Sequence, residues 1–357
     1  MSARLDTFLE LAVKQGGSDL HLVTGQLPCV RIAGVLHRIR FRELSAEDLE
    51  QILLECMDER QIAELRDRGA VDFAHQVEGL GRFRVNVYRH ARGLAAALRV
   101  VPAAVPTLED LGLPTVLGHQ ALQPKGLILV TGPTGAGKST TLAAMVDLLN
   151  GTRRGHIITL EDPIEFVHPV KSCVVTQREI GVHAPTFADA LRDAVREDPD
   201  VILVGELRDL ESISLALTAA ETGIQVLATL HTGSAAKTID RVVNVFPARR
   251  QEQIRAMLAE SLRMVVSQRL LRSADGARRV VAAEVLVNTH AAAAMIRAGN
   301  SHKLESVIQA GGALGMQGLE SVLRDLVRRK LVDPEDARTH ELDRSSFDST
   351  TPMRDAA

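Results

Sequence analysis

A glycine-rich run in the middle of the chain has the composition and spacing of a phosphate-binding loop. Residues 132–139 read Gly-Pro-Thr-Gly-Ala-Gly-Lys-Ser and match the pattern GxxxxGK[ST] at every fixed position. Small residues let successive backbone N–H groups turn inward around phosphate oxygens. Lys138 would then reach the β- and γ-phosphates of a nucleotide, and the Ser139 hydroxyl would hold Mg²⁺. The residues expected to bind nucleotide are Gly132, Pro133, Thr134, Gly135, Ala136, Gly137, Lys138, Ser139 and Thr140.

Carboxylates follow two apolar runs downstream of this loop. The run Val201–Val204 precedes Glu206, and a carboxylate at the carboxyl end of a buried strand can orient Mg²⁺ through its water shell. Glu161 follows Ile157–Leu160 in the same way, within the acidic segment 159–165. Acids close to phosphates are unfavourable unless they meet a metal, water or a cation. We therefore expect Glu206 to act on the metal and Glu161 to polarise the attacking water.

A histidine follows a fourth apolar run. His231 comes directly after residues 225–230 and could sense a γ-phosphate by hydrogen bonding. A lone histidine is more often structural than functional, so this role depends on the motifs around it. With Glu161 and Glu206, His231 completes the expected catalytic set.

These residues must be held by a common scaffold. The apolar runs 127–130, 157–160, 201–204 and 225–229 alternate with helical segments, which is typical of a parallel sheet with crossover helices. Residues 1–105 mix short strands with helices, including one helix over 45–65 that Ser45 and Asp48 would cap. After Arg250 the chain reads as mostly helical, with one further strand over 279–287. We expect a small α+β domain over 1–105, a linker over 106–120, an ATPase-type α/β domain over 121–340 and a disordered tail over 341–357.

Composition narrows the function classes. The chain has 357 residues with 42 basic and 45 acidic side chains, so its net charge of −3 gives no global basic field for nucleic acid. Aromatic residues are 3% of the chain, a poor supply for stacking bases. The three cysteines contain no CxxC pair, which disfavours a zinc ribbon and a disulfide scaffold. No secretory leader or apolar run of about 18 residues appears, so we expect a cytoplasmic protein without nucleic acid as a partner.

The motifs occur in an order that resembles the secretion ATPase superfamily of type II secretion and type IV pilus systems. That family carries a Walker A motif, an Asp box, a Walker B motif and a His box. The run Leu191–Asp209 is especially specific, and the similarity extends over about residues 4–338. The matching segments are Gly132–Ser139, Thr159–Glu165, Leu191–Glu206 and Glu221–His231.

Within this superfamily the chain looks like the pilus retraction branch, PilT/PilU. Its N-terminal domain is short, and it lacks the zinc-binding tetracysteine of the extension and secretion ATPases. The segments 234–241 and 312–317 also read like the retraction branch. The resemblance therefore implies a motor that couples ATP hydrolysis to pilus retraction and twitching motility.

The resemblance implies further features of fold, cofactors and partners. It implies an α/β fold class, with a PAS-like N-terminal domain and a RecA-like P-loop ATPase domain whose C-terminal part is helical. ATP and Mg²⁺ would be the cofactors, and the protein would form a homo-hexameric ring. Arg82, Arg84 and Arg99 resemble arginines that complete the site from a neighbouring domain or subunit, although each could instead be a solvated strand-face charge. The ring would act peripherally at the inner membrane, on a pilus platform protein and with a paralogous retraction ATPase.

Two departures from the family pattern keep alternatives open. The His box usually carries a second histidine where this chain has Ile224. The stretch Ala291–Ala298 keeps only Ile296 and Arg297 of a distinctive retraction motif. The alternatives are an accessory PilU-like subunit, a non-hydrolysing regulatory ring subunit, and an assembly or secretion ATPase; a DNA-translocating motor is disfavoured by charge.

Overall fold

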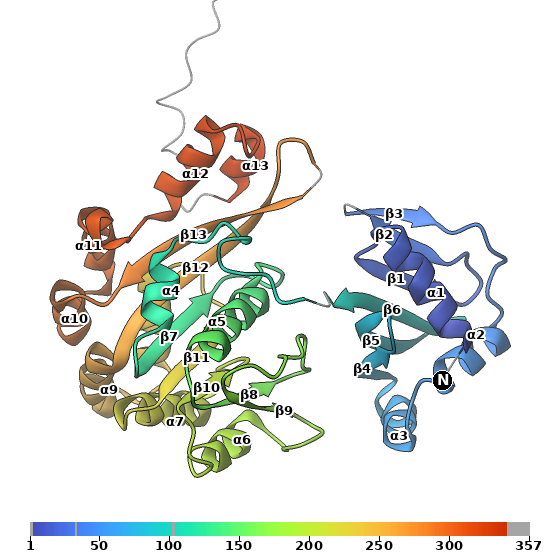
Figure 1. Ribbon diagram of the computed structural model, residues 1–357, viewed down its shortest axis with the longest axis horizontal. Helices are drawn as coiled ribbons and strands as arrows, with labels where there is room; N and C mark the ends of the chain where they lie inside the picture. The colour runs from blue at the N-terminus through green and yellow to red at the C-terminus, as the bar shows by residue number, and fades with distance from the viewer. Residues whose placement is uncertain (1–2, 33, 102–103, 277, 341–357) are drawn as a thin grey trace, which may run out of the picture. The chain divides into compact units, whose positions relative to one another are not determined.

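Two β-sheets organise the chain, one in each of the two units into which the computed structural model divides (Figure 1). The structure describes residues 3–32, 34–101, 104–276 and 278–340, so the tail expected over 341–357 lies outside the described residues. The first unit comprises Met1–Val105 and Pro163–Val167, and the second comprises Pro106–Asp162 and His168–Ala357.

The first unit contains an antiparallel sheet in the order β3-β2-β1-β6-β5-β4. Alternate side chains along the strands, such as Phe83, Val85 and Val87, are buried in one core with the apolar faces of the helices. The elements are α1 (Ala3–Lys14), β1 (Asp19–Val23), β2 (Cys29–Ile32), β3 (Val35–Arg38), α2 (Ala46–Leu54), α3 (Glu59–Arg68), β4 (Ala70–Val77), β5 (Gly81–His90) and β6 (Gly93–Val101).

The helix expected over 45–65 is two helices. Ser45 caps α2 as expected, because its side chain accepts the Asp48 N–H at 3.1 Å. The chain then leaves the helix, and Asp58 starts α3 with a capping box that pairs it with Gln61. A short acidic side chain competes with the helical backbone and favours a new helix start, which periodicity alone does not reveal.

The second unit contains a larger sheet in the order β13-β12-β7-β11-β10-β8-β9. All neighbours from β12 to β9 pair in parallel, and only β13 is antiparallel to its partner. Strands β7, β10 and β11 are buried along their whole length, as expected for strands covered on both faces. The strands are β7 (Gly126–Thr131), β8 (His156–Glu161), β9 (Val174–Glu179), β10 (Val201–Val204), β11 (Gln225–Leu230), β12 (Leu262–Arg272) and β13 (Arg279–Val287).

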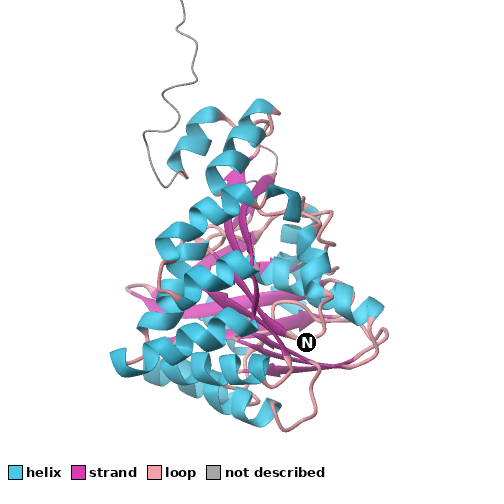
Figure 2. Cartoon of the chain, turned by 90° about the vertical axis from the view of Figure 1, so that its left-hand side faces the viewer, coloured by secondary structure: helices cyan, strands magenta, loops and turns pink. Residues whose placement is uncertain are grey.

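Helices cover both faces of this sheet (Figure 2). Leu127 and Leu129 of β7 face α6, α7 and α9, whereas Ile128 and Val130 face α4 and α5. The helices are α4 (Val116–Ala121), α5 (Lys138–Thr152), α6 (Phe187–Ala194), α7 (Leu210–Glu221), α8 (Ala235–Asn244), α9 (Ala248–Ser261), α10 (His290–Arg297), α11 (Leu304–Ala310), α12 (Leu319–Arg328) and α13 (Pro334–Thr339).

The expectation of a mostly helical chain after Arg250 with a single strand is wrong in one respect. Residues 262–272 form β12, which pairs with β7 on one side and β13 on the other. Its side chains are buried on both faces over most of its length, and polar residues interrupt its apolar ones irregularly, so the sequence carries no alternation that distinguishes a strand from a helix. The cysteines also differ in burial: Cys173 is buried, while Cys29 and Cys56 are half-buried.

Candidate active site

The glycine-rich loop connects β7 to α5, and glycine is favoured at three places in it, Gly132, Gly135 and Gly137, because each has a positive φ. Gly132 has φ +144°, and a Cβ there would lie 2.5 Å from the carbonyl oxygen of Gln268 on β12. Gly137 has φ +84° and stands at the N-cap of α5, whose first residue is Lys138. The loop therefore presents the amino end of a long helix, where unpaired backbone N–H groups favour anions.

Lys138 curls back over the loop that precedes it. Its Nζ donates to the carbonyl oxygens of Gly132 at 3.0 Å and Pro133 at 2.9 Å, and the side chain is buried. A buried ammonium held by loop carbonyls stays close to the space that the backbone N–H groups surround. Around it, Ala136 is buried, Gly137 and Thr140 are half-buried, and Pro133, Thr134, Gly135 and Ser139 are exposed.

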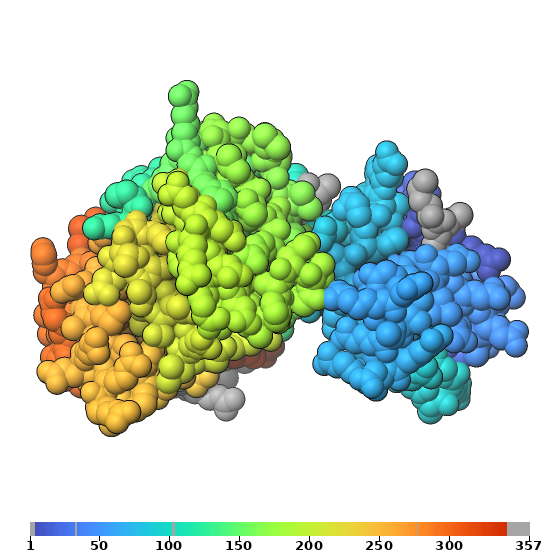
Figure 3. Space-filling model, turned by 90° about the horizontal axis from the view of Figure 1, so that it is seen from below, coloured from blue at the N-terminus to red at the C-terminus, as the bar shows by residue number. Residues whose placement is uncertain are grey.

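Parallel pairing brings the other predicted residues to the same edge of the sheet. Glu161 is the last residue of β8, Glu206 follows β10 by two residues, and His231 follows β11 directly. Because β7, β11, β10 and β8 are parallel neighbours in that order, their carboxyl ends share one edge with the glycine-rich loop. Residues 126–231, which carry these motifs, are green to yellow in Figure 3.

Glu206 contacts His231 of another motif and Arg208, which lies two residues further along its own run. His231 Nε2 lies 3.3 Å from Glu206 Oε1, and Arg208 Nε donates to Glu206 Oε2 at 2.8 Å. Arg208 also lies 3.7 Å from Asp162, next to Glu161, and its guanidinium stacks 5.9 Å from the ring centre of Phe187. The hydrogen bond to Glu206 raises the pKa of Arg208, so this cation stays charged between two acids.

Glu161 is oriented by its neighbours on the sheet. Thr159 Oγ1 donates to Glu161 Oε1 at 2.6 Å, and Gln177 Nε2 of β9 donates to the same oxygen at 3.1 Å. Sequence reasoning missed both Arg208 and Gln177. Arg208 lies inside the specific run that ends at Asp209, so its position was a usable signal, whereas no pattern singles out Gln177.

The three predicted arginines all lie in the first unit. Arg84 and Arg99 are directly opposite each other on β5 and β6. Arg99 Nε lies 2.9 Å from Asp19, while Arg84 lies 3.9 Å from Asp72 and 3.6 Å from Glu165. Arg82 Nε donates to the carbonyl oxygen of Ile164 at 3.1 Å, within the 163–167 segment of the same unit.

Ile224 lies at the opposite end of β11 from His231. Its backbone bonds to Ala219 and Gly126, and its side chain packs against the core of the second unit. Six strand residues separate it from His231, and these seven steps along the chain correspond to about 23 Å at roughly 3.3 Å per residue. The histidine missing from the family pattern would therefore be far from the glycine-rich loop within this unit.

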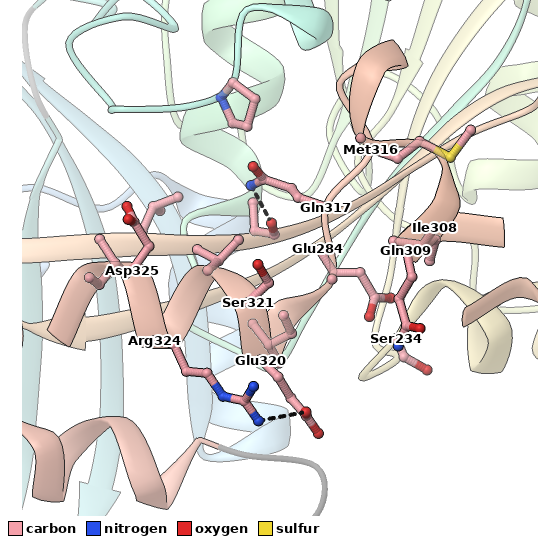
Figure 4. A pocket seen from close by; sticks show the side chains of 18 of the residues that line it. Ser234, Glu284, Ile308, Gln309, Met316, Gln317, Glu320, Ser321, Arg324 and Asp325 are labelled. Carbon is pink, nitrogen blue, oxygen red and sulfur yellow. Dashed lines mark hydrogen bonds and ion pairs between the residues drawn. The ribbon is translucent and has the colours of Figure 1, made fainter. Parts of the chain in front are cut away.

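A cavity of about 1090 Å³ is separate from these motifs (Figure 4). It lies between α11, α12, β13 and residues 112–114. Glu284 on its wall is 7% exposed, accepts the Ala235 N–H at 2.6 Å and also bonds to the Leu319 backbone. Burial raises the pKa of Glu284. This carboxylate thereby joins the first residues of α8 and α12, a structural role at two helix N-termini.

Two features are absent from the described residues. In residues 3–32, 34–101, 104–276 and 278–340, no helix is long and apolar enough to span a bilayer. The same described ranges contain no group of three or more His, Cys, Asp and Glu side chains arranged to hold a metal without other ligands. A metal bound through Ser139 and Glu206 would thus need oxygen atoms from a nucleotide and from water as well.

A parallel sheet with a GxxxxGK[ST] loop at its carboxyl edge, acids on neighbouring strands and a helix behind the loop defines a P-loop ATPase. The model of the Type II/IV secretion system protein family matches residues 2–307, and the chain belongs to that family. The α/β fold class predicted from the sequence, with a small N-terminal domain and a RecA-like ATPase domain, is confirmed by this match and by the solved structures described next.

Several characterised proteins are similar over nearly the whole chain. The type IV pilus retraction ATPase PilT of Pseudomonas aeruginosa is 49% identical over 330 residues, which cover 92% of this chain and 96% of PilT. A twitching motility protein of Neisseria gonorrhoeae is 48% identical and is matched over 83% of its length and 87% of this chain. PilU of P. aeruginosa is 38% identical, over 94% of this chain and 88% of PilU.

Solved structures agree with this grouping. A crystal structure of the pilus retraction motor PilT with bound ADP superposes with a TM-score of 0.87 at 44% identity, covering 96% of this chain and 98% of that one. The ATPase DotB of Legionella pneumophila gives a TM-score of 0.82 at 30% identity, with 95% of each chain covered. The family assignment made from the motifs, including the PilT/PilU branch, is confirmed.

Proposed function

We propose that this protein is an ATP-hydrolysing motor that drives the retraction of type IV pili. The observation that carries the proposal is the meeting of Glu206, His231 and Arg208 at the sheet edge that also bears the glycine-rich loop. The similarity to PilT along nearly the whole chain supports the pilus as the substrate of the motor.

The residues of the site fit a magnesium–nucleotide complex. Gly132 lets the loop pack against the backbone of β12, where a Cβ would collide, and the αL residue Gly137 turns the chain into α5, so the two glycines hold the loop at the amino end of this helix. Backbone N–H groups of the loop and Lys138 would hold the β- and γ-phosphates, while Ser139 and Glu206 would hold Mg²⁺ and its water. Bound Mg²⁺ would offset the charge that develops on the phosphates.

The remaining residues act around the γ-phosphate. Glu161 accepts a proton from the attacking water and orients it, and its own orientation is set by hydrogen bonds from the sheet. His231 lies against Glu206 and reports the presence of the γ-phosphate to the segment that leads into α8. Arg82, Arg84 and Arg99 complete the site from a neighbouring subunit, where their positive charges stabilise the transition state.

The assembled protein works as a homo-hexamer at the cytoplasmic face of the inner membrane. Its partners are a pilus platform protein and a paralogous retraction ATPase, and nucleic acid is not a substrate. We take the domain boundaries to be at 105, 120 and 340, and propose that the two domains rotate about the linker over residues 106–120 as ATP is bound and released.

One alternative function has a specific observation behind it. The divergent stretch 291–298 and Ile224 would suit an accessory PilU-like or regulatory subunit, because both depart from the retraction pattern. The identity of 49% to PilT against 38% to PilU favours the motor itself. An assembly or secretion ATPase is weaker still, since the matches to proteins of these two classes are 35% and 34% identical and cover 73% and 75% of this chain.

The deciding experiment measures ATP hydrolysis and pilus retraction with the same variants. Glu206→Gln should bind ATP but lower kcat about 100-fold or more, since it acts after binding. Glu260→Gln, an exposed acid of α9, serves as the matched control and should behave like the wild type. Retraction should be lost with Glu206→Gln in cells that lack the native protein. A wild-type preparation that binds but never hydrolyses ATP, alone or with a paralogue, would establish the regulatory subunit instead.

A further inference from the structure

Gln177 joins a proposed catalytic residue to a loop that sequence motifs do not include. It lies on β9, the edge strand of the larger sheet, and its Cα is paired in register with Thr159 of β8. In a parallel pair, residues in register and residues two apart share one face of the sheet. Gln177, Thr159 and Glu161 therefore project from the same face at its carboxyl edge.

The orientation of the Gln177 amide follows from its two partners. The His168 backbone N–H is a donor only, so the Gln177 atom 2.9 Å away must be the carbonyl Oε1. The amide nitrogen Nε2 then points to Glu161 Oε1, which it meets at 3.1 Å. The amide cannot turn over without losing both bonds, so it offers a fixed donor to the carboxylate.

This donor counters an unfavourable charge nearby. Glu179 is paired in register with Glu161 and carries the same charge on the same face. Like charges opposite each other on neighbouring strands repel, which would turn the Glu161 side chain away from the sheet. Thr159 and Gln177 both donate to Oε1, and these two bonds favour one orientation of the carboxylate.

We propose that Gln177 is a positioning residue for ATP hydrolysis, acting by holding the Glu161 carboxylate toward the attacking water. The inference rests on the proposed role of Glu161 and names the residue that makes this role possible. The backbone N–H of His168, in the loop 168–173, donates to the Gln177 amide. β9 and this loop therefore support the proposed base together.

Two substitutions separate this role from simple support of the loop. Gln177→Glu keeps an acceptor for the His168 N–H but cannot donate to Glu161, and it adds a like charge. Gln177→Ala removes both contacts. We expect kcat to fall about tenfold or more in each variant, with the KM for ATP changed less than about threefold, because orientation of the base acts after binding. Thermal melting checks that each variant is folded.

A double-mutant cycle then tests whether the effect passes through Glu161. In the Glu161→Gln background, measured by single-turnover hydrolysis, Gln177→Glu should change the residual rate less than about twofold. If Gln177→Glu does not fold, Gln177→Met carries the same expectations in both backgrounds.

The outcomes distinguish this inference from the proposed function. Gln177→Glu with a near wild-type kcat beside an inactive Glu161→Gln would overturn the inference alone and assign Gln177 to loop support. An equal loss of rate in both backgrounds would overturn it as well, since the effect would not pass through Glu161. A wild-type rate in Glu161→Gln by itself would overturn the role of the base and this inference together.

Discussion

Arg208 and Glu206 are two residues apart in sequence, and their side chains meet at 2.8 Å between Nε and Oε2. The chain turns sharply after β10, which lets the arginine fold back on the acid and also approach Asp162 at 3.7 Å. One guanidinium therefore links the acid that follows β10 with the acidic segment that follows β8. Its planar fork can contact two carboxylates at once, which the single ammonium of a lysine cannot do in the same geometry.

Replacing this guanidinium by an ammonium tests the link. Arg208→Lys should lower kcat about tenfold with the KM for ATP changed less than about threefold, because charge is kept but the two acids are no longer held together. Steady-state ATPase assays provide the measurement. Arg192→Lys is the matched control, since Arg192 also bridges two acids, Asp189 and Glu211, on the surface of α6 and α7. A rise in KM alone would reassign Arg208 to nucleotide binding.

Loss of the buried ammonium should abolish tight nucleotide binding. Lys138→Ala removes the side-chain cation of the loop and should weaken ATP binding about 100-fold or more, measured by calorimetry. Lys171→Ala is the control, because Lys171 instead pairs with Asp147 at 2.7 Å. Equal affinity in wild type and Lys138→Ala would contradict the assignment of the phosphate site.

Two glycines of the same loop–helix segment should respond in opposite directions to alanine. Gly132→Ala places a Cβ 2.5 Å from a backbone oxygen at positive φ and should lower the free energy of unfolding by about 2 kcal/mol or more. Gly151→Ala, near the end of α5, meets no atom within 4 Å and should raise it by up to about 1 kcal/mol. Urea unfolding measures both. An unchanged free energy of unfolding in Gly132→Ala would mean that β12 shifts to accommodate the new Cβ.

The stability of the second unit should fall in acid because of His168. Burial lowers the pKa of His168 to about 4, from 6.5 when exposed. Below pH 6.5 the unfolded chain gains a proton that the folded protein does not accept until about pH 4, so stability is lost as pH falls through this window. The free energy of unfolding should be about 2 kcal/mol lower at pH 5 than at pH 7.5.

Urea titrations of the wild type and His168→Leu at both pH values isolate this contribution. The variant has no titrating ring. Between pH 7.5 and 5 its free energy of unfolding should therefore fall by about 2 kcal/mol less than that of the wild type. Parallel pH dependence in the two proteins would show that the ring is protonated as readily in the folded state as in the unfolded chain.

The strands that carry the motifs could be predicted because they are covered on both faces. Residues 127–130 and 201–204 are continuous apolar runs, and residues 157–160 are interrupted only by Thr159; the structure forms strands over each of them. The helix cap at Ser45 was predictable because it depends on residues three apart. Local chemistry of this kind is readable without any tertiary contact.

The features that sequence reasoning missed depend on contacts between distant segments. Residues 262–272 form a strand because β7 and β13 lie on either side, and neither partner is visible in a local pattern. The bond between Gln177 and Glu161 needs the register of β8 against β9, which the loop between them does not reveal. Arg208 lay within the recognised motif, but its contact with Glu206 depends on the turn after β10.

The strand order of the larger sheet has a consequence for the synthesis of this chain. The two partners of β7 are β11 and β12, and both follow it in sequence, β11 by about a hundred residues. A chain emerging from the ribosome therefore presents an apolar strand with no native neighbour until residues 225–230 have been made. Strands β8 and β10 can pair with each other before then, β11 then joins them to β7, and β12 follows on the other side of β7. The nascent protein thus depends on late insertion of a central strand, and its unpaired β7 is where a chaperone would be expected to bind.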